Sequence, residues 1–191
     1  MKRRSLLVLG ILTLLILLFL AGPRVTVEHR PYAEVLPDDL ISHLAASEAA
    51  YPDITPGAEK TIIWANPQHQ QTELAIVYLH GFSATRQETA PLCDDLAISL
   101  AANLFYTRLT GHGRSNAAMA EASAGDWLKD AEEALAIGKR LGRKVIIIGT
   151  STGGTLATWL AATQNDPQVL AYVLLSPNFA PKDPAAQVLT W

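Results

Sequence analysis

Cysteine is almost absent from the sequence, which has Cys93 alone among its 191 residues. A single thiol excludes an intramolecular disulfide and any metal cluster built on several cysteines. It also leaves no cysteine near the N-terminus for attachment of a lipid. Leu92 and Leu96 accompany Cys93 on a predicted helix, so we expect the thiol to be buried.

Basic side chains are scarce after the first thirty residues. From residue 31 on, the chain has ten Lys and Arg against seventeen Asp and Glu, a formal charge of −7. An acidic body without a basic cluster is a poor match for a phosphate backbone, so we exclude nucleic acid as a partner. The spacing of potential ligands predicts no metal ion and no organic cofactor.

Charge is missing altogether from Leu6–Ala21, a run rich in Leu and Ile that follows basic residues at positions 2–4. Such a segment is typical of a signal peptide or of a transmembrane helix. A cleavable signal has small residues at alternate positions before the cut, whereas Phe19 precedes Ala21 by two positions and Pro23 follows closely. We therefore predict a retained membrane anchor, with secretion after cleavage as the alternative.

The basic residues before this run predict its orientation. Positive charge is retained in the cytoplasm, so we expect the rest of the chain on the outer side of the membrane, which is the periplasm in a bacterium. We divide the chain into an anchor or signal segment at 1–22, a juxtamembrane linker at 23–60 and a globular domain at 61–191. The linker includes one amphipathic helix, Asp38–Ala50, in which Leu40, Ile41 and Leu44 share a face.

Apolar runs and amphipathic stretches alternate after residue 60. The predicted strands are Thr61–Ala65, Leu74–Leu79, Leu104–Thr107, Val145–Ile148 and Val169–Leu175. The predicted helices run from about Leu92 to Ala102, Asp126 to Leu141 and Gly154 to Gln164. This alternation predicts an α/β fold, in which a mostly parallel sheet is covered by helices on both faces.

Both ends of the second of these helices carry a local signal. Ser123 stands three positions before Asp126, as in a capping box. Gly142 follows Leu141 directly, where a left-handed C-cap would lie.

The most specific motif is Gly149-Thr150-Ser151-Thr152-Gly153, which lies between an apolar strand and a helix of small residues. A serine on a sharp strand-to-helix turn adopts a strained backbone conformation, and Gly149 and Gly153 allow strand and helix to close around it. The turn exposes the hydroxyl near a helix N-terminus, where the helix dipole favours a developing oxyanion. We therefore predict Ser151 as a nucleophile, against the alternative of an ordinary glycine-rich turn.

Two further motifs precede this serine in the chain. His80-Gly81-Phe82 ends the strand Leu74–Leu79, and Gly111-His112-Gly113-Arg114-Ser115 follows the next strand. With these three motifs in this order, the chain from Thr61 to Ser176 resembles the α/β-hydrolase family, in particular its monoacylglycerol lipase and lysophospholipase branch. The resemblance implies that residues 61–191 are the N-terminal part of such a domain.

The resemblance also implies roles for individual residues. The backbone N–H groups of Phe82 and Thr152 would bind the substrate oxyanion from two separate loops. His80 and Gly81 would support the first of these loops, because a histidine that precedes the nucleophile is out of order for the catalytic base. His112 is either a proton carrier or a residue that fixes its loop by a hydrogen bond.

No histidine follows His112, and the acids after Ser151 are Asp166 and Asp183 alone. A serine hydroxyl needs a base to take its proton and an acid to orient that base. We expect Asp166 to lie at the amino end of its strand, away from the site. Asp183 follows the last strand in a proline-flanked loop, and it is a candidate triad acid only in a variant layout. Our expectation is therefore that the triad acid and histidine belong to strand units beyond Trp191.

These observations predict a serine hydrolase of carboxylic esters, of the esterase, lipase or lysophospholipase type, that forms an acyl-enzyme at Ser151. The substrate would be a small or lipid ester. A peptidase or thioesterase on the same fold is one alternative, because the elbow does not select the leaving group. A non-catalytic, membrane-tethered binding protein with a degenerate hydrolase fold is the other.

Overall fold

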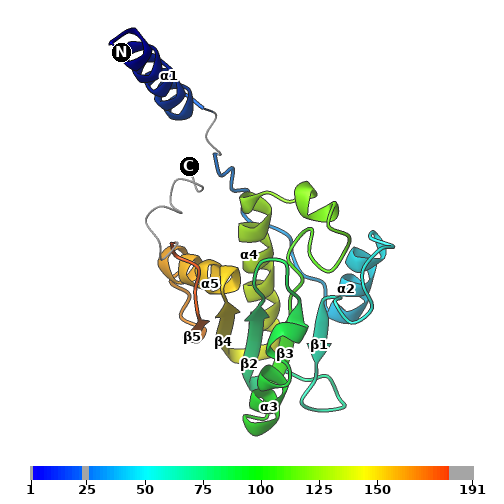
Figure 1. The fold of residues 1–191 in the computed structure, drawn as a ribbon. Helices are drawn as coiled ribbons and strands as arrows, with labels where there is room; N and C mark the ends of the chain where they lie inside the picture. The colour runs from blue at the N-terminus through cyan, green and yellow to red at the C-terminus, as the bar shows by residue number, and fades with distance from the viewer. Residues whose placement is uncertain (1, 23–25, 181–191) are drawn as a thin grey trace.

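A five-stranded sheet forms the centre of the protein, with strand order β1-β3-β2-β4-β5 (Figure 1). The computed structural model describes residues 2–22 and 26–180. The strands are β1 (Thr61–Ile63), β2 (Thr72–Leu79), β3 (Asn103–Tyr106), β4 (Gly142–Thr150) and β5 (Val169–Leu175). β1 pairs antiparallel with β3, and the other three pairs are parallel. The predicted mostly parallel sheet is confirmed.

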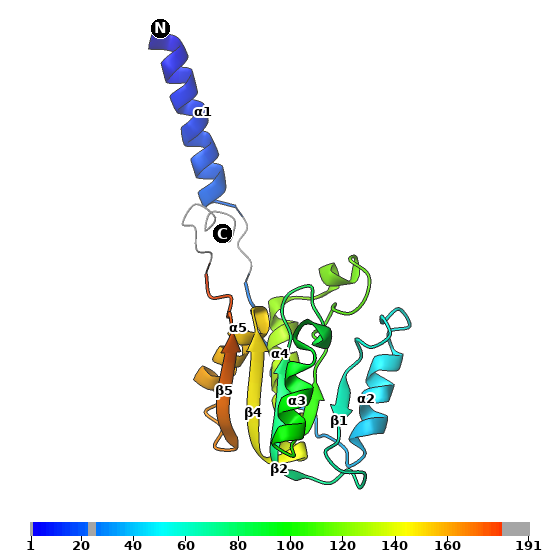
Figure 2. The same ribbon diagram turned by 60° about the horizontal axis from the view of Figure 1, so that its bottom comes forward.

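Helices cover both faces of the sheet (Figure 2). They are α3 (Leu92–Ser99) on one face, and α4 (Ala124–Leu141) and α5 (Thr152–Thr163) on the other. Side chains of β2 alternate between them, because successive residues of a strand point to opposite faces. Val77 packs against the α4 and α5 side, and Ile76 against α3. Each such buried side chain stabilises the fold by roughly 1.5–3 kcal/mol relative to exposure.

The two predicted signals at the ends of α4 have different outcomes. The capping box is confirmed, since Ser123 Oγ accepts the N–H of Asp126 and the Asp126 carboxylate accepts that of Ser123. The left-handed C-cap is wrong, because Gly142 has an extended backbone with φ −144° and is the first residue of β4. It pairs with Thr72, and a Cβ there would lie 2.4 Å from the amide nitrogen of Ala75. Close strand approach explains this glycine.

The segment before β1 packs against the domain. The Glu132 carboxylate on α4 accepts the N–H of Tyr32 at 2.7 Å, and Arg140 forms an ion pair with Asp38 at 3.0 Å. The short helix α2 (Leu40–Ala49) buries Leu40 and Leu44 in the core. Ile41, predicted on the same face, is 46% exposed. Two short 3-10 helices, η1 (Arg86–Thr89) and η2 (Ala118–Glu121), lie in the loops after β2 and β3.

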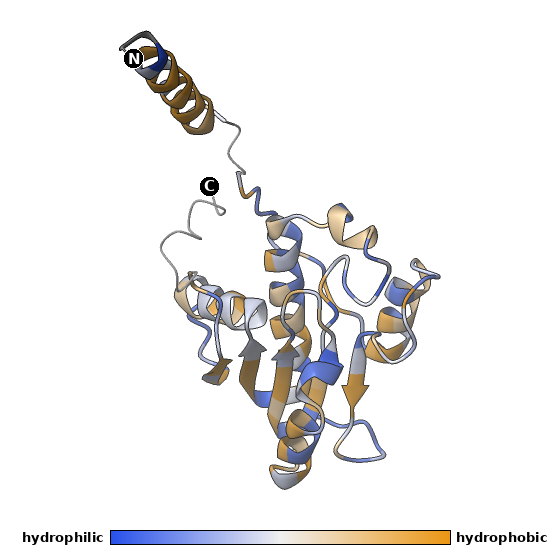
Figure 3. Cartoon of the chain, in the orientation of Figure 1, coloured by the Kyte–Doolittle hydropathy of each residue, from blue (hydrophilic) through white to orange (hydrophobic). Residues whose placement is uncertain are grey.

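At the N-terminus, α1 (Lys2–Leu20) stands apart from the sheet and is apolar along most of its length (Figure 3). Its apolar side chains are exposed, from Leu6 at 68% to Leu20 at 50%. None of the helices within residues 2–22 and 26–180 is both long and apolar enough to cross a membrane. The predicted transmembrane span at Leu6–Ala21 is therefore not supported by the structure.

Candidate functional site

Ser151 lies on the sharp turn between β4 and α5. Its backbone has φ 50° and ψ −112°, a conformation that a residue with a Cβ rarely adopts. Two backbone hydrogen bonds hold it there: the Ser151 N–H donates to the Leu175 carbonyl at 2.9 Å, and the Ser151 carbonyl accepts the N–H of Asn178 at 3.1 Å. The strained elbow predicted for this serine is thus present, and the loop after β5 supports it.

Gly149 and Gly153 allow this turn to close. A Cβ on Gly153 would lie 1.9 Å from the Leu79 carbonyl oxygen, and one on Gly149 would lie 2.3 Å from the Gly153 carbonyl oxygen. Both distances are far below any van der Waals contact, so neither position accepts even a methyl group. The first residue of α5, Thr152, has an amide at the helix start, where N–H groups have no acceptor within the helix. This end of the helix favours negative charge.

His80 joins the turn after β2 to the loop after β3. Its side chain is fully buried, and Nε2 accepts the N–H of Leu109 at 3.0 Å. Nδ1 lies 2.9 Å from the Gly81 carbonyl, to which it must donate once Nε2 is an acceptor. Burial lowers the pKa of His80 to about 4, so the ring is neutral at pH 7. The structure gives this histidine the supporting contacts that its motif predicted.

The backbone of Gly81 binds a glutamate at the edge of the site. The Gly81 N–H donates to Glu88 Oε1 at 2.5 Å, and the Tyr78 hydroxyl donates to the same oxygen at 2.8 Å. The Tyr78 oxygen also shares a hydrogen bond of 3.0 Å with the hydroxyl of Thr150, the residue before the nucleophile. Sequence reasoning missed Glu88, because its contact depends on how residues 82–87 fold back over Gly81, and no local motif marks it.

Phe82 lies beside Gly81 and is 59% exposed. Its ring contacts two others edge to face, His112 at 6.0 Å and Trp127 at 5.9 Å between centroids. Trp127 Nε1 donates to the Thr110 carbonyl at 2.9 Å, and His112 Nδ1 lies 3.2 Å from the same oxygen. These contacts connect the predicted oxyanion loop to the start of α4, and they agree with a loop-fixing role for His112.

Of the two acids that follow Ser151, Asp166 binds Lys139 Nζ at 2.6 Å and lies before the amino end of β5. This position is opposite to the carboxyl ends of the strands, where Ser151 lies. Asp183 lies outside the described residues. Cys93 lies on α3 and is buried against the sheet, as predicted.

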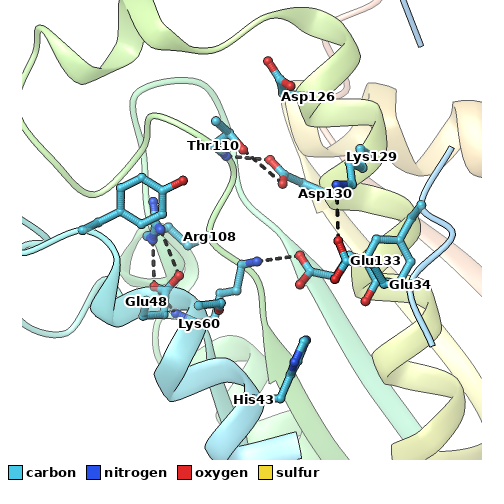
Figure 4. Close-up of a pocket in the computed structure, with 13 residues that line it drawn as sticks. Glu34, His43, Glu48, Lys60, Arg108, Thr110, Asp126, Lys129, Asp130 and Glu133 are labelled. Atoms are coloured by element: carbon cyan, nitrogen blue, oxygen red, sulfur yellow. Dashed lines mark hydrogen bonds and ion pairs between the residues drawn. The ribbon is translucent and has the colours of Figure 1, made fainter. Parts of the chain in front are cut away.

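A separate polar cavity of about 350 Å³ lies between α2, α4 and the loop after β3 (Figure 4). Charged side chains of opposite sign face one another across it: Arg108 binds Glu48 at 2.8 Å, and Lys60 binds Glu133 at 2.5 Å. Asp130 accepts the N–H of Thr110 at 2.6 Å and lies near its hydroxyl at 3.1 Å. Burial raises the pKa of Asp130 to about 6. Neither Ser151 nor Phe82 lines this cavity.

The likeness to known proteins covers the same part of the chain as the three motifs. The hydrolase family described as Serine aminopeptidase, S33, matches residues 70–191. The thermostable monoacylglycerol lipase of Bacillus sp. (strain H-257) is 29% identical over 93 residues, which are 49% of this chain and 37% of that enzyme.

Two solved structures have the same arrangement of helices and strands. One comes from work on LipS and LipT, two metagenome-derived lipolytic enzymes, and is 25% identical to this chain. Its TM-score is 0.62, and the match covers 72% of this chain and 53% of that one. Est1E from Butyrivibrio proteoclasticus, solved with ferulic acid bound, is 20% identical with a TM-score of 0.51, over 62% and 48%. The chain thus spans about half the length of these relatives or less.

Proposed function

The chain belongs to the α/β-hydrolase family described as Serine aminopeptidase, S33, and on that premise we propose that the full-length protein is a serine hydrolase of carboxylic esters. The observation that carries the proposal is the strained turn at Ser151, with its φ of 50° at the start of α5. Strain of this kind is retained where it positions a reacting group.

In the proposed reaction, Ser151 Oγ attacks the ester carbonyl and its proton passes to a base. The carbonyl π electrons move to the oxygen, which the N–H groups of Phe82 and Thr152 bind as an oxyanion. Collapse of this intermediate expels the alcohol, which takes up the proton, and leaves an acyl-enzyme. Water then attacks the acyl group, the Ser151 hydroxyl is regenerated and the acid is released.

The substrate class rests on similarity together with the proposed site. Two of the relatives are named as a monoacylglycerol lipase and as lipolytic enzymes, which supports an uncharged lipid-like ester. The family description names a peptidase, so an amide substrate is the second candidate. The comparison that separates them is the ratio of kcat/KM for an ester and an amide of the same acyl group.

The test uses the full-length protein and a serine-reactive fluorophosphonate. We expect Ser151 to be labelled and Ser151→Ala to lose both labelling and p-nitrophenyl ester hydrolysis, the latter by on the order of 10⁴-fold or more. Ser99→Ala on α3 is the matched control, because it removes an exposed hydroxyl far along the chain from the elbow. A wild-type protein that folds but neither labels nor hydrolyses would support the alternative of a binding protein without catalysis.

We also propose that α1 associates with a membrane and that the domain lies on its outer side. The support is the continuous exposure of apolar side chains along this helix, which favours contact with lipid. Fractionation of cells that express the full-length protein tests the association. A soluble form that starts near Pro23 would instead indicate cleavage of a signal peptide.

A further inference from the structure

An unneutralised carboxylate lies beside the proposed nucleophile. Glu88 Oε2 is 3.1 Å from the point at which a Cβ of Gly81 would stand, and Ser151 Cβ is 3.3 Å from the same point. The two atoms therefore lie within about 6.5 Å of each other. Glu88 is exposed, so solvent reaches this side chain close to the elbow.

The position of this charge is fixed. Glu88 Oε1 accepts hydrogen bonds from the Gly81 N–H and the Tyr78 hydroxyl, which hold the carboxylate against the turn. The neighbouring cation is engaged elsewhere, since Arg86 donates to the Gly57 carbonyl at 3.0 Å and lies over the ring of Tyr106. Within residues 2–22 and 26–180, no ion pair involves Glu88.

We propose that Glu88 determines the charge preference of the Ser151 site, so that the enzyme acts on uncharged or cationic esters and discriminates against esters with an anionic group next to the carbonyl. This inference rests on the proposed function and narrows its substrate class. A phosphate or carboxylate on the substrate would stand close to a fixed negative charge of the same sign. Monoacylglycerol-like esters would be accepted, and lysophospholipid-like esters disfavoured.

The size of the effect follows from Coulomb's law. For a substrate charge about 6 Å from the Glu88 carboxylate, near the protein surface, the interaction of the two unit charges changes the rate by about three- to tenfold. The effects on a cation and on an anion have opposite signs, so the ratio of their kcat/KM values should be about tenfold to a hundredfold. Added salt screens exposed charges, so this ratio should fall toward one as the ionic strength rises.

The experiment measures kcat/KM of the full-length protein for three esters of equal length that carry a trimethylammonium, an uncharged amide or a carboxylate group at the same position next to the ester carbonyl. We expect Glu88→Gln to reduce the cation-to-anion ratio by about tenfold or more. Gln keeps an oxygen that can accept the Gly81 N–H, so the turn remains supported. Asp95→Asn, which removes an exposed carboxylate from α3, should leave the ratio unchanged.

A ratio in Glu88→Gln equal to that of wild type would overturn the inference, as would an equal shift in Asp95→Asn. The salt dependence of the wild-type ratio tests the same claim without any variant, and a ratio that does not respond to salt counts against it. Failure of the proposed function looks different: a wild-type protein that hydrolyses none of the three esters and resists the fluorophosphonate overturns both.

Discussion

The elbow at Ser151 and the polar cavity beside α4 are built on different principles. In the elbow, backbone atoms approach so closely that Gly149 and Gly153 leave no room for a side chain. In the cavity, long charged side chains such as Arg108 and Lys60 meet partners from distant parts of the chain. The first region is determined by steric exclusion within a few residues, and the second by charge pairing across the fold. The two should respond to substitution in different ways.

The largest loss of stability is expected from a substitution in the elbow. Gly153→Ala places a methyl group 1.9 Å from the Leu79 carbonyl oxygen, so the strand and helix must separate. We expect the free energy of unfolding to fall by more than about 5 kcal/mol, or the protein not to fold at all. Urea denaturation followed by circular dichroism measures this. Gly10→Ala is the matched control, because a Cβ there meets nothing within 4 Å; comparable losses in both variants would refute the steric explanation.

Breaking one ion pair in the cavity should lower the free energy of unfolding somewhat less than Gly153→Ala does. Arg108 and Glu48 are both buried and joined by two hydrogen bonds of 2.8 and 2.9 Å. Arg108→Met leaves the Glu48 carboxylate buried and unpaired, with an expected loss of about 4 kcal/mol in urea denaturation. Replacing both partners, as Glu48→Leu with Arg108→Met, should restore part of the loss, because neither member of the pair is left as a buried charge without its partner. A double variant less stable than the single one would contradict this.

The cavity should also respond to pH in a way that the elbow does not. Burial raises the pKa of Asp130 to about 6 from an ordinary value of 3.8. The folded state then holds a proton that the unfolded state releases, so Asp130 makes the protein less stable as the pH rises from about 4 to 6, by at most about 3 kcal/mol. Asp130→Asn should remove this contribution.

His80 has the opposite effect on stability over much the same pH range. Its pKa is lowered to about 4, so its contribution to stability is present above about pH 6.5 and is lost as the pH falls toward 4. The informative quantity is therefore the difference between Asp130→Asn and wild type, measured by urea denaturation at pH 4, 5, 6 and 7. A difference that stays constant across these values would show that Asp130 does not titrate there.

The smallest effect is expected at the start of α4. Ser123→Ala removes the hydroxyl that accepts the Asp126 N–H, and the loss should be about 1 kcal/mol in the same assay. Because this contact is exposed and local, the losses from Ser123→Ala and Arg108→Met should be additive in the double variant. Marked non-additivity would indicate that the helix start and the cavity act as one unit.

The sequence by itself determined the features that depend on neighbours in the chain. Alternating apolar runs predicted the strands, Ser123 and Asp126 predicted the capping box, and the glycines around Ser151 predicted the elbow. Steric exclusion and local hydrogen bonds act over three or four residues, so a short motif contains all the information they need. The buried thiol of Cys93 followed in the same way, from apolar residues on its own helix.

Only the tertiary structure decided which distant groups meet. Gly142 looked like a helix cap, and its real constraint is the backbone of Ala75 on the neighbouring strand. Glu88 gave no signal in the sequence, and the turn brings its carboxylate to Gly81 beside Ser151. The pairing of Glu48 with Arg108 spans sixty residues. Contacts of this kind depend on the path of the chain through space, so the spacing of residues along it cannot reveal them.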